Sequence, residues 1–140
     1  MEWTGGCLCG AIRYRAKTDP FWAGHCHCKM CQSWTGSAAF TCAFFALGQL
    51  EWTRDKPSYF QSSKDVQLSF CRTCGSSIGF HRAEHHDGVT AGTLDNPERI
   101  KPEVHMFAEH EHAWAKIDDG LPRQDGFLPE DENFDDPDLH

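Results

Sequence analysis

The sequence lacks a long apolar run and a recognisable leader. Its longest mostly apolar stretch extends from Ser37 to Leu50, and Thr41 and Gln49 interrupt it. A membrane-spanning helix needs about 20 apolar residues, so we expect no such helix. The first residues, MEWTGGC, contain neither the basic nor the apolar region of a secretory signal. We therefore expect a cytoplasmic protein.

Positive charge is also scarce, with 13 Lys and Arg against 21 Asp and Glu and a net charge of −8. Residues 1–117 hold 12 of each sign, whereas residues 118–140 hold Arg123 alone against nine acids. A neutral body with an acidic end repels phosphate backbones, so we expect no nucleic-acid partner. We expect one domain over residues 1–129 and a mobile acidic tail over residues 130–140.

Helical periodicity is missing from every long segment, which argues against a helical fold. Short segments bounded by Gly and Pro are typical of β-strands instead; in residues 11–16, for example, apolar Ile12 and Tyr14 alternate with arginines. We predict strands over residues 11–16, 38–47, 50–53, 58–61, 67–71, 77–81, 88–91 and 104–107. One short helix is predicted from Cys28 to Trp34, ending at Gly36. The predicted fold class is mostly β.

Several catalytic motifs are absent as well: the sequence has no glycine-rich phosphate loop, nucleophile elbow or HExxH motif. The later histidines give weak signals. His85 and His86 precede a turn predicted at Asp87-Gly88, and we expect both to face water. The segment 109–112, Glu-His-Glu-His, could bind a metal opportunistically.

Cysteine, in contrast, is abundant, with eight residues in a chain of 140. Seven of them form three clusters, which are Cys7 with Cys9, Cys26 with Cys28 and Cys31, and Cys71 with Cys74. Cytoplasmic thiols stay reduced, and close neighbours chelate metal more readily than they bridge each other, so the clusters predict metal binding rather than disulfides. The remaining Cys42 lies in an apolar run, and we interpret it as a buried small side chain.

A structural zinc site is predicted at Cys7, Cys9, Cys71 and Cys74. Two cysteines three positions apart and followed by a glycine resemble a zinc knuckle, because a positive φ at Gly75 lets backbone N–H groups face the sulfurs. A knuckle supplies two ligands. Cys7 and Cys9 can supply the other two, since residues i and i+2 of a strand point the same way.

A second, catalytic zinc site is predicted at Cys26, Cys28 and Cys31. A strand that runs into a helical turn would aim the three sulfurs at one point. Three protein ligands leave one tetrahedral position open, as in catalytic zinc sites. A closed site remains an alternative, with Cys42, His25 or His27 as the fourth ligand. Redox chemistry is a further alternative, although neither CxxC opens a long helix.

The order CxC, CxCxxC, CxxCG resembles the glutathione-dependent formaldehyde-activating enzyme family, which includes centromere protein V. The segments GGCLCGAIRY, HCHCKMCQSWTGSAAF, FCRTCGSSIGF, AGTLDNP, HMF and DGLP add to the resemblance. It implies a small all-β zinc fold, Mss4-like or β-tent. It also implies two Zn²⁺ per chain, a structural ion on the four-cysteine set and a catalytic ion on Cys26, Cys28 and Cys31.

The implied activity is that of a carbon–sulfur lyase, which forms or cleaves S-(hydroxymethyl)glutathione from glutathione, a small-molecule thiol, and an aldehyde. A metal-bound thiol loses its proton near neutral pH, and the resulting sulfur attacks the aldehyde carbon. His25, His27, Asp95 and Glu103 are all conceivable general bases. The alternative is a non-catalytic interaction module with two structural zinc sites; a zinc-linked redox sensor is a third hypothesis.

Overall fold

The computed structural model describes residues 2–127. The tail expected over residues 130–140 lies outside this part, so its mobility stays a prediction. Within residues 2–127, no helix has the length and apolar character needed to cross a membrane.

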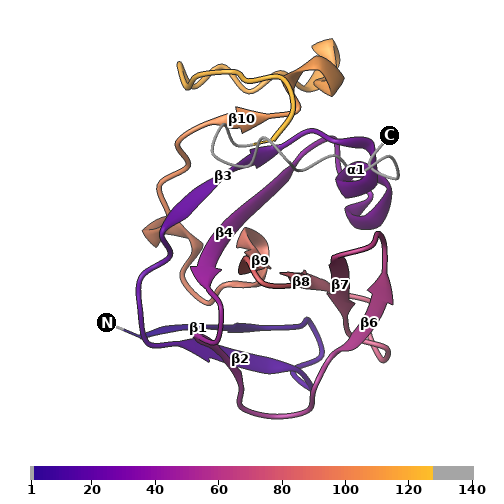
Figure 1. The fold of residues 1–140 in the computed structure, drawn as a ribbon, viewed down its shortest axis with the longest axis vertical. Helices are drawn as coiled ribbons and strands as arrows, with labels where there is room; N and C mark the ends of the chain where they lie inside the picture. The colour runs from indigo at the N-terminus through magenta and orange to yellow at the C-terminus, as the bar shows by residue number, and fades with distance from the viewer. Residues whose placement is uncertain (1, 128–140) are drawn as a thin grey trace.

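Within the described residues, two β-sheets, one short α-helix and four single-turn 3₁₀-helices make up the fold (Figure 1), and the predicted mostly β class is confirmed. A three-stranded sheet has the order β1-β2-β5, and a seven-stranded sheet has the order β10-β3-β4-β9-β8-β7-β6. The strands of the small sheet are β1 (Trp3–Gly6), β2 (Arg13–Ala16) and β5 (Leu50–Trp52). Those of the large sheet are β3 (Trp22–Cys26), β4 (Phe40–Ala46), β6 (Ser58–Gln61), β7 (Val66–Phe70), β8 (Ser77–Arg82), β9 (His86–Thr90) and β10 (His105–Met106).

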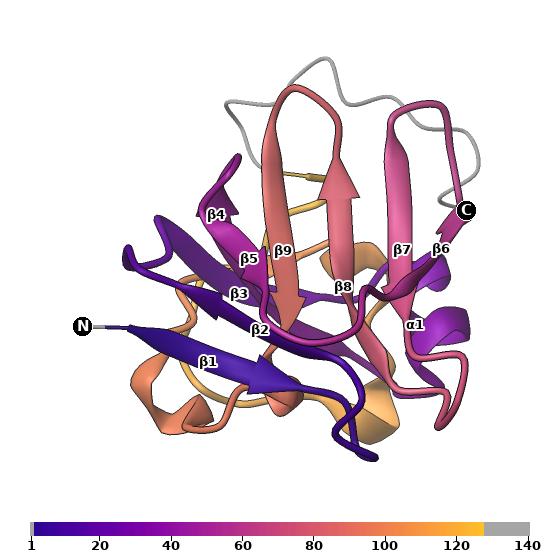
Figure 2. The same ribbon diagram turned by 90° about the horizontal axis from the view of Figure 1, so that it is seen from below.

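The alternation predicted around β2 is observed. Ile12 and Tyr14 are buried, whereas Arg13 and Arg15 face outward and pair with acidic side chains. The buried residues of β1 and β2 pack against those of β4, β8 and β9, so one hydrophobic core joins the two sheets. In Figure 2, strands β9, β8, β7 and β6 stand side by side, and β1 and β2 run beneath them.

Strand β3 lies between β4 and β10, and its C-terminal end leads into the helix. It pairs antiparallel with β4 and parallel with β10, where His105 is the register partner of His25. Helix α1 (Lys29–Thr35) follows with Cys28 as its N-cap. It ends at Gly36, whose φ of 73° closes the helix as predicted.

Two elements and one turn differ from the expectation. Strands β1 and β3 are not among the predicted strands, because β1 holds two glycines and β3 is buried on both faces and does not alternate. The turn predicted at Asp87-Gly88 lies instead at residues 83–85, and β9 begins at His86. His86 is therefore buried, with its ring stacked on Phe44 at 4.5 Å, while His85 is exposed as expected.

Candidate metal centres

The structure brings Cys7, Cys9, Cys71 and Cys74 together. Their four Sγ atoms all lie within 4.8 Å of one another. The Sγ of Cys9 is 3.6 Å from that of Cys7 and 3.8 Å from that of Cys71. A tetrahedral zinc ion with Zn–S bonds of about 2.3 Å holds its sulfurs about 3.8 Å apart. The four thiols therefore fit a zinc ion by spacing and by donor type.

The backbone around this four-cysteine set explains its shape. Gly75 has a φ of 78°, as predicted, and its N–H donates to the Cys71 carbonyl at 2.7 Å. Cys7 and Cys9 lie in a turn after β1 rather than on a strand, which corrects the expected i, i+2 geometry. The turn is closed by the Gly10 N–H, which donates to the Cys7 carbonyl at 3.2 Å, and it aims both sulfurs at the knuckle.

Hydrogen bonds already favour thiolate character in part of the set. Burial opposes ionisation of Cys7, but the Ile12 N–H, which donates to its Sγ at 3.2 Å, and the neighbouring thiols lower its pKa overall. The Ser76 hydroxyl and N–H lower the pKa of Cys74 to about 5. Such backbone and hydroxyl donors are typical of the groups that support metal-bound thiolates.

Cys26, Cys28 and Cys31 form a second group, whose Sγ atoms also lie within 4.8 Å of one another. Cys26 ends β3, Cys28 caps α1 and Cys31 lies in its first turn, so the strand-to-helix transition aims all three at one point. The Sγ atoms of Cys26 and Cys31 are 3.6 Å apart, and the Cys31 N–H donates to the Cys28 Sγ at 3.3 Å. This spacing also suits a tetrahedral thiolate metal site.

The three thiols share their protons unequally. Hydrogen bonds from the Cys26 and Cys31 side chains lower the pKa of Cys28 to about 3. The same interactions, with burial, raise the pKa of Cys26 and of Cys31 well above its usual value. These opposite shifts favour the thiolate form at Cys28, and a divalent cation bound by all three sulfurs would replace the protons of Cys26 and Cys31.

None of the side chains weighed as a fourth ligand joins the group of three sulfurs. Cys42 does not belong to the group of three; its thiol donates to the Gly24 carbonyl at 3.6 Å, and burial raises its pKa. His25 and His27 each form donor groups with His105 and a carboxylate instead. Among residues 2–127, therefore, the sulfurs of Cys26, Cys28 and Cys31 are the set that could share one ion here.

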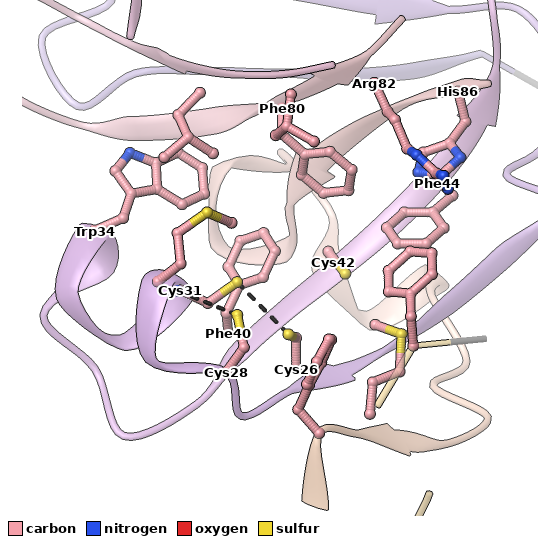
Figure 3. A pocket seen from close by; sticks show the side chains of 16 residues that line it. Cys26, Cys28, Cys31, Trp34, Phe40, Cys42, Phe44, Phe80, Arg82 and His86 are labelled. Carbon is pink, nitrogen blue, oxygen red and sulfur yellow. Dashed lines mark hydrogen bonds between the residues drawn. The ribbon is translucent and has the colours of Figure 1, made fainter. Parts of the chain in front are cut away.

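A cavity of about 40 Å³ borders these three cysteines. Its lining is mostly aromatic and sulfur-bearing and includes Met30, Trp34, Phe40, Phe44, Phe80 and Met106. Figure 3 shows the three sulfurs close together on one side, with Arg82 and His86 beside Phe44 at the opposite end. Cys42 also lines the cavity. An apolar lining of this kind excludes water from whatever binds next to the sulfurs.

Other residues weighed from the sequence lie away from this cavity. Asp95 is paired with Arg13 and also accepts from the Thr4 hydroxyl at 2.7 Å, and Glu103 lies outside the lining. The sequence reasoning missed Phe80, Met106 and Phe107 as lining residues. The cavity therefore combines residues from β3, β4, β7, β8, β9, β10 and α1, which only the folded topology brings together.

Comparisons with known proteins agree with the cysteine pattern. A family profile described as glutathione-dependent formaldehyde-activating enzyme matches residues 2–110. A protein of Schizosaccharomyces pombe, called an uncharacterized lyase, is 30% identical over 56% of this chain and 57% of its own length. The chain thus spans little more than half of that relative.

A solved structure supports the same fold. The crystal structure of a Rhodobacter sphaeroides protein is similar with a TM-score of 0.54 at 20% identity, covering 86% of this chain and 99% of that one. The profile match extends over most of the chain and includes every cysteine of both groups. The chain therefore belongs to the glutathione-dependent formaldehyde-activating enzyme family.

Proposed function

We propose that this protein is a zinc-dependent carbon–sulfur lyase that forms or cleaves adducts of a thiol with an aldehyde, S-(hydroxymethyl)glutathione being the adduct that the family name suggests. The observation that carries the proposal is the convergence of Cys26, Cys28 and Cys31 on the wall of an apolar cavity. The lyase name of the yeast relative supports the reaction class.

The reaction needs no oxidant or reductant. In the forward direction a C–S bond forms between the thiol sulfur and the carbonyl carbon, and the proton of the thiol ends on the carbonyl oxygen. The reverse direction returns this proton to sulfur. A Zn²⁺ bound to three cysteines would supply an open position that stabilises the substrate sulfur as a thiolate. A Zn²⁺ with three thiolate ligands is a soft Lewis acid, so it would bind a substrate sulfur better than it would activate a water molecule.

The chain's own residues supply the surroundings for this chemistry. Cys26 and Cys28 are held by the end of β3 and by the helix cap, so their sulfurs are positioned before a ligand binds. The aromatic lining would keep bulk water away from the reacting carbon, so that hydration of the aldehyde competes less with addition of the thiol. We further propose that Cys7, Cys9, Cys71 and Cys74 hold a second, structural Zn²⁺, whose role is stability.

A thiol titration of the cobalt-substituted protein tests the proposal. Co²⁺ adopts the tetrahedral geometry of Zn²⁺ and reports its ligands by visible absorption. We expect glutathione or a small thiol to shift the bands of one of the two thiolate-bound ions, because only the three-cysteine site has an open position. If no thiol perturbs either ion, both sites are closed. The catalytic proposal would then fail, and a structural zinc module would replace it.

A further inference from the structure

A third group of metal-binding side chains lies on the face of β3 opposite the cysteines. Because side chains alternate along a strand, His25 points away from the three-cysteine group to which Cys26 belongs. His105 on the neighbouring strand β10 is its register partner. The imidazole rings of His25 and His105 stack with their centroids 4.7 Å apart, and the centroids of the His105 and His27 rings lie 5.1 Å apart. Figure 1 shows β10 beside β3, with the chain after β10 folded back over this end of the sheet.

The returning chain places a carboxylate against two of these rings. Asp119 lies with its two oxygens 3.0 and 3.1 Å from Nε2 of His105. Its Oδ2 is also 3.6 Å from Nε2 of His25. The three donor atoms all lie within 4.8 Å of one another. Ligand atoms of a tetrahedral ion with bonds of about 2.1 Å lie about 3.4 Å apart. The distances from Asp119 to His105 Nε2, 3.0 and 3.1 Å, are slightly shorter than this value, and the distance to His25 Nε2, 3.6 Å, is slightly longer.

Nδ1 of each ring has a hydrogen-bond partner, and this holds Nε2 of the same ring toward Asp119. Nδ1 of His25 is 2.8 Å from the Thr41 hydroxyl, and Nδ1 of His105 is 2.8 Å from Nε2 of His27. The Leu121 N–H donates to Asp119 at 3.1 Å. Metal-binding histidines almost always have such a partner on their other nitrogen, because it sets the tautomer and the orientation of the ring.

A competing set on the same face is less suited to a cation. Glu111 lies 3.6 Å from Nε2 of His27, but Arg123 donates to both of its oxygens at 2.8 and 3.2 Å. That carboxylate already has a positive partner. The oxygens of Asp119 instead contact two imidazoles and a backbone N–H, and its side chain is 26% exposed, so an ion can reach it from solvent.

We propose that His25, His105 and Asp119 form a third metal site, which binds a divalent transition-metal ion such as Zn²⁺ through two nitrogens and one carboxylate. The borderline N/O ligand set suits Zn²⁺ and Co²⁺ and differs from the two thiolate centres. Three protein ligands leave room for water at the exposed side. The ion would tie the segment around Asp119 to β3 directly behind the three-cysteine group.

The test fills the cysteine sites with two equivalents of Zn²⁺ and then titrates the full chain with Co²⁺. A third site predicts one further equivalent with the d–d bands of an N/O-coordinated ion and without the sulfur-to-cobalt charge-transfer band. Asp119→Asn should weaken this binding at least tenfold and leave the zinc content unchanged. Because Asp119 is partly exposed, this variant retains the packing of the buried His105.

Asp87→Asn serves as the matched control, since Asp87 on β9 accepts from His81 on β8 at 2.6 Å and this partly buried His–Asp pair belongs to none of the metal-binding groups in residues 2–127. It should bind the third equivalent as the wild type does. The proposal is overturned if Co²⁺ binds only with a sulfur charge-transfer band, if no further equivalent binds, or if Asp119→Asn binds it as tightly as the wild type. His25→Gln gives an independent second variant with the same expected loss.

Discussion

Cys28 and Cys42 show how position decides what a thiol can do. Both are buried and both line the same cavity. Cys28 has two neighbouring thiols and a backbone N–H directed at its sulfur, whereas Cys42 donates to a carbonyl. The same cavity therefore borders Cys28, whose sulfur is placed to bind a cation with two neighbours, and Cys42, whose sulfur remains a neutral thiol.

Replacing each of these cysteines by serine separates the two roles. Cys28→Ser should remove one thiolate-bound metal ion per chain and lower the proposed lyase activity at least about 100-fold. Losing a residue that only hydrogen-bonds to a metal ligand costs about 10–100-fold, and losing the ligand itself should cost more. Cys42→Ser makes the same atomic change in the same cavity and should keep both thiolate-bound ions. Metal analysis and steady-state kinetics measure these effects. Unfolding of Cys28→Ser would instead indicate a structural site.

Asp95 gives a pH-dependent prediction at the surface. Hydrogen bonds from Arg13 and then Thr4 hold the pKa of this carboxyl below its ordinary value of 3.8. The interaction therefore stabilises the fold above that value, and its contribution is lost as the pH falls through the lower pKa of the folded state. Since the Asp95 side chain is 46% exposed, we expect at most about 1 kcal/mol.

Asp95→Asn should accordingly lower the melting temperature slightly at neutral pH. The melting temperature of this variant should also fall less than that of the wild type as the pH is lowered. Thermal unfolding followed by circular dichroism over an acid pH series measures this. Asp55→Asn removes one carboxylate elsewhere and serves as a control. An equal acid dependence in Asp95→Asn and the wild type would contradict the prediction.

At the scale of elements, the contact between β3 and the chain before β10 is unusually close. A Cβ at Gly24 would meet the Trp22 ring and would lie 2.8 Å from the Val104 carbonyl oxygen. That oxygen accepts from the His25 N–H at 3.0 Å. Only a glycine lets the two backbones approach in this way, and the pairing holds His25 and Cys26 on their opposite faces.

Gly24→Ala should therefore destabilise the protein by about 1–3 kcal/mol, as overpacking in a tight interior does. Gly92→Ala is the control, because nothing lies within 4 Å of a Cβ at that position. Chemical denaturation of both variants gives the difference. Equal stability of the two would show that β10 can move away from β3 without cost.

The elements near this contact are also the hardest to predict. Strand β2 can be predicted from the sequence, because the apolar Tyr14 alternates with the charged Arg13 and Arg15. Strand β3 cannot, since it is buried on both faces and shows no period. The membership of the two cysteine groups follows from the spacing of the cysteines, because metal geometry constrains which sulfurs can meet, but the turn that carries Cys7 and Cys9 does not. His105 and Asp119 have no such pattern, and only the parallel pairing of β10 with β3 brings them to His25.

At the scale of the whole molecule, the four-cysteine set connects the turn after β1 to the turn after β7. Cys9 and Cys71 are 62 positions apart. A cross-link that closes a loop of this length stabilises a fold by about 4 kcal/mol in the chain-entropy description. The three-cysteine group closes no comparable loop, because its members lie within six residues.

Metal removal should therefore act mainly through the four-cysteine set. We expect a strong chelator to lower the melting temperature by about 10–15 °C, and Cys9→Ser to lower it similarly without chelator. Cys9 is exposed, so its substitution costs no packing. Leu8→Ser, at the neighbouring exposed position, should have little effect in calorimetry. A melting temperature insensitive to chelator would contradict a structural role for these cysteines.

The different sequence spans of the two cysteine groups have a consequence for biosynthesis. During translation, Cys26, Cys28 and Cys31 leave the ribosome almost together and can capture an ion as a short peptide. Cys7 and Cys9 must wait for Cys74, which at about 5–20 residues per second means several seconds with unpaired thiols. If these cysteines hold the structural ion proposed above, the nascent chain is most vulnerable to oxidants and to the wrong metal at the turn that carries Cys7 and Cys9, before that ion can bind.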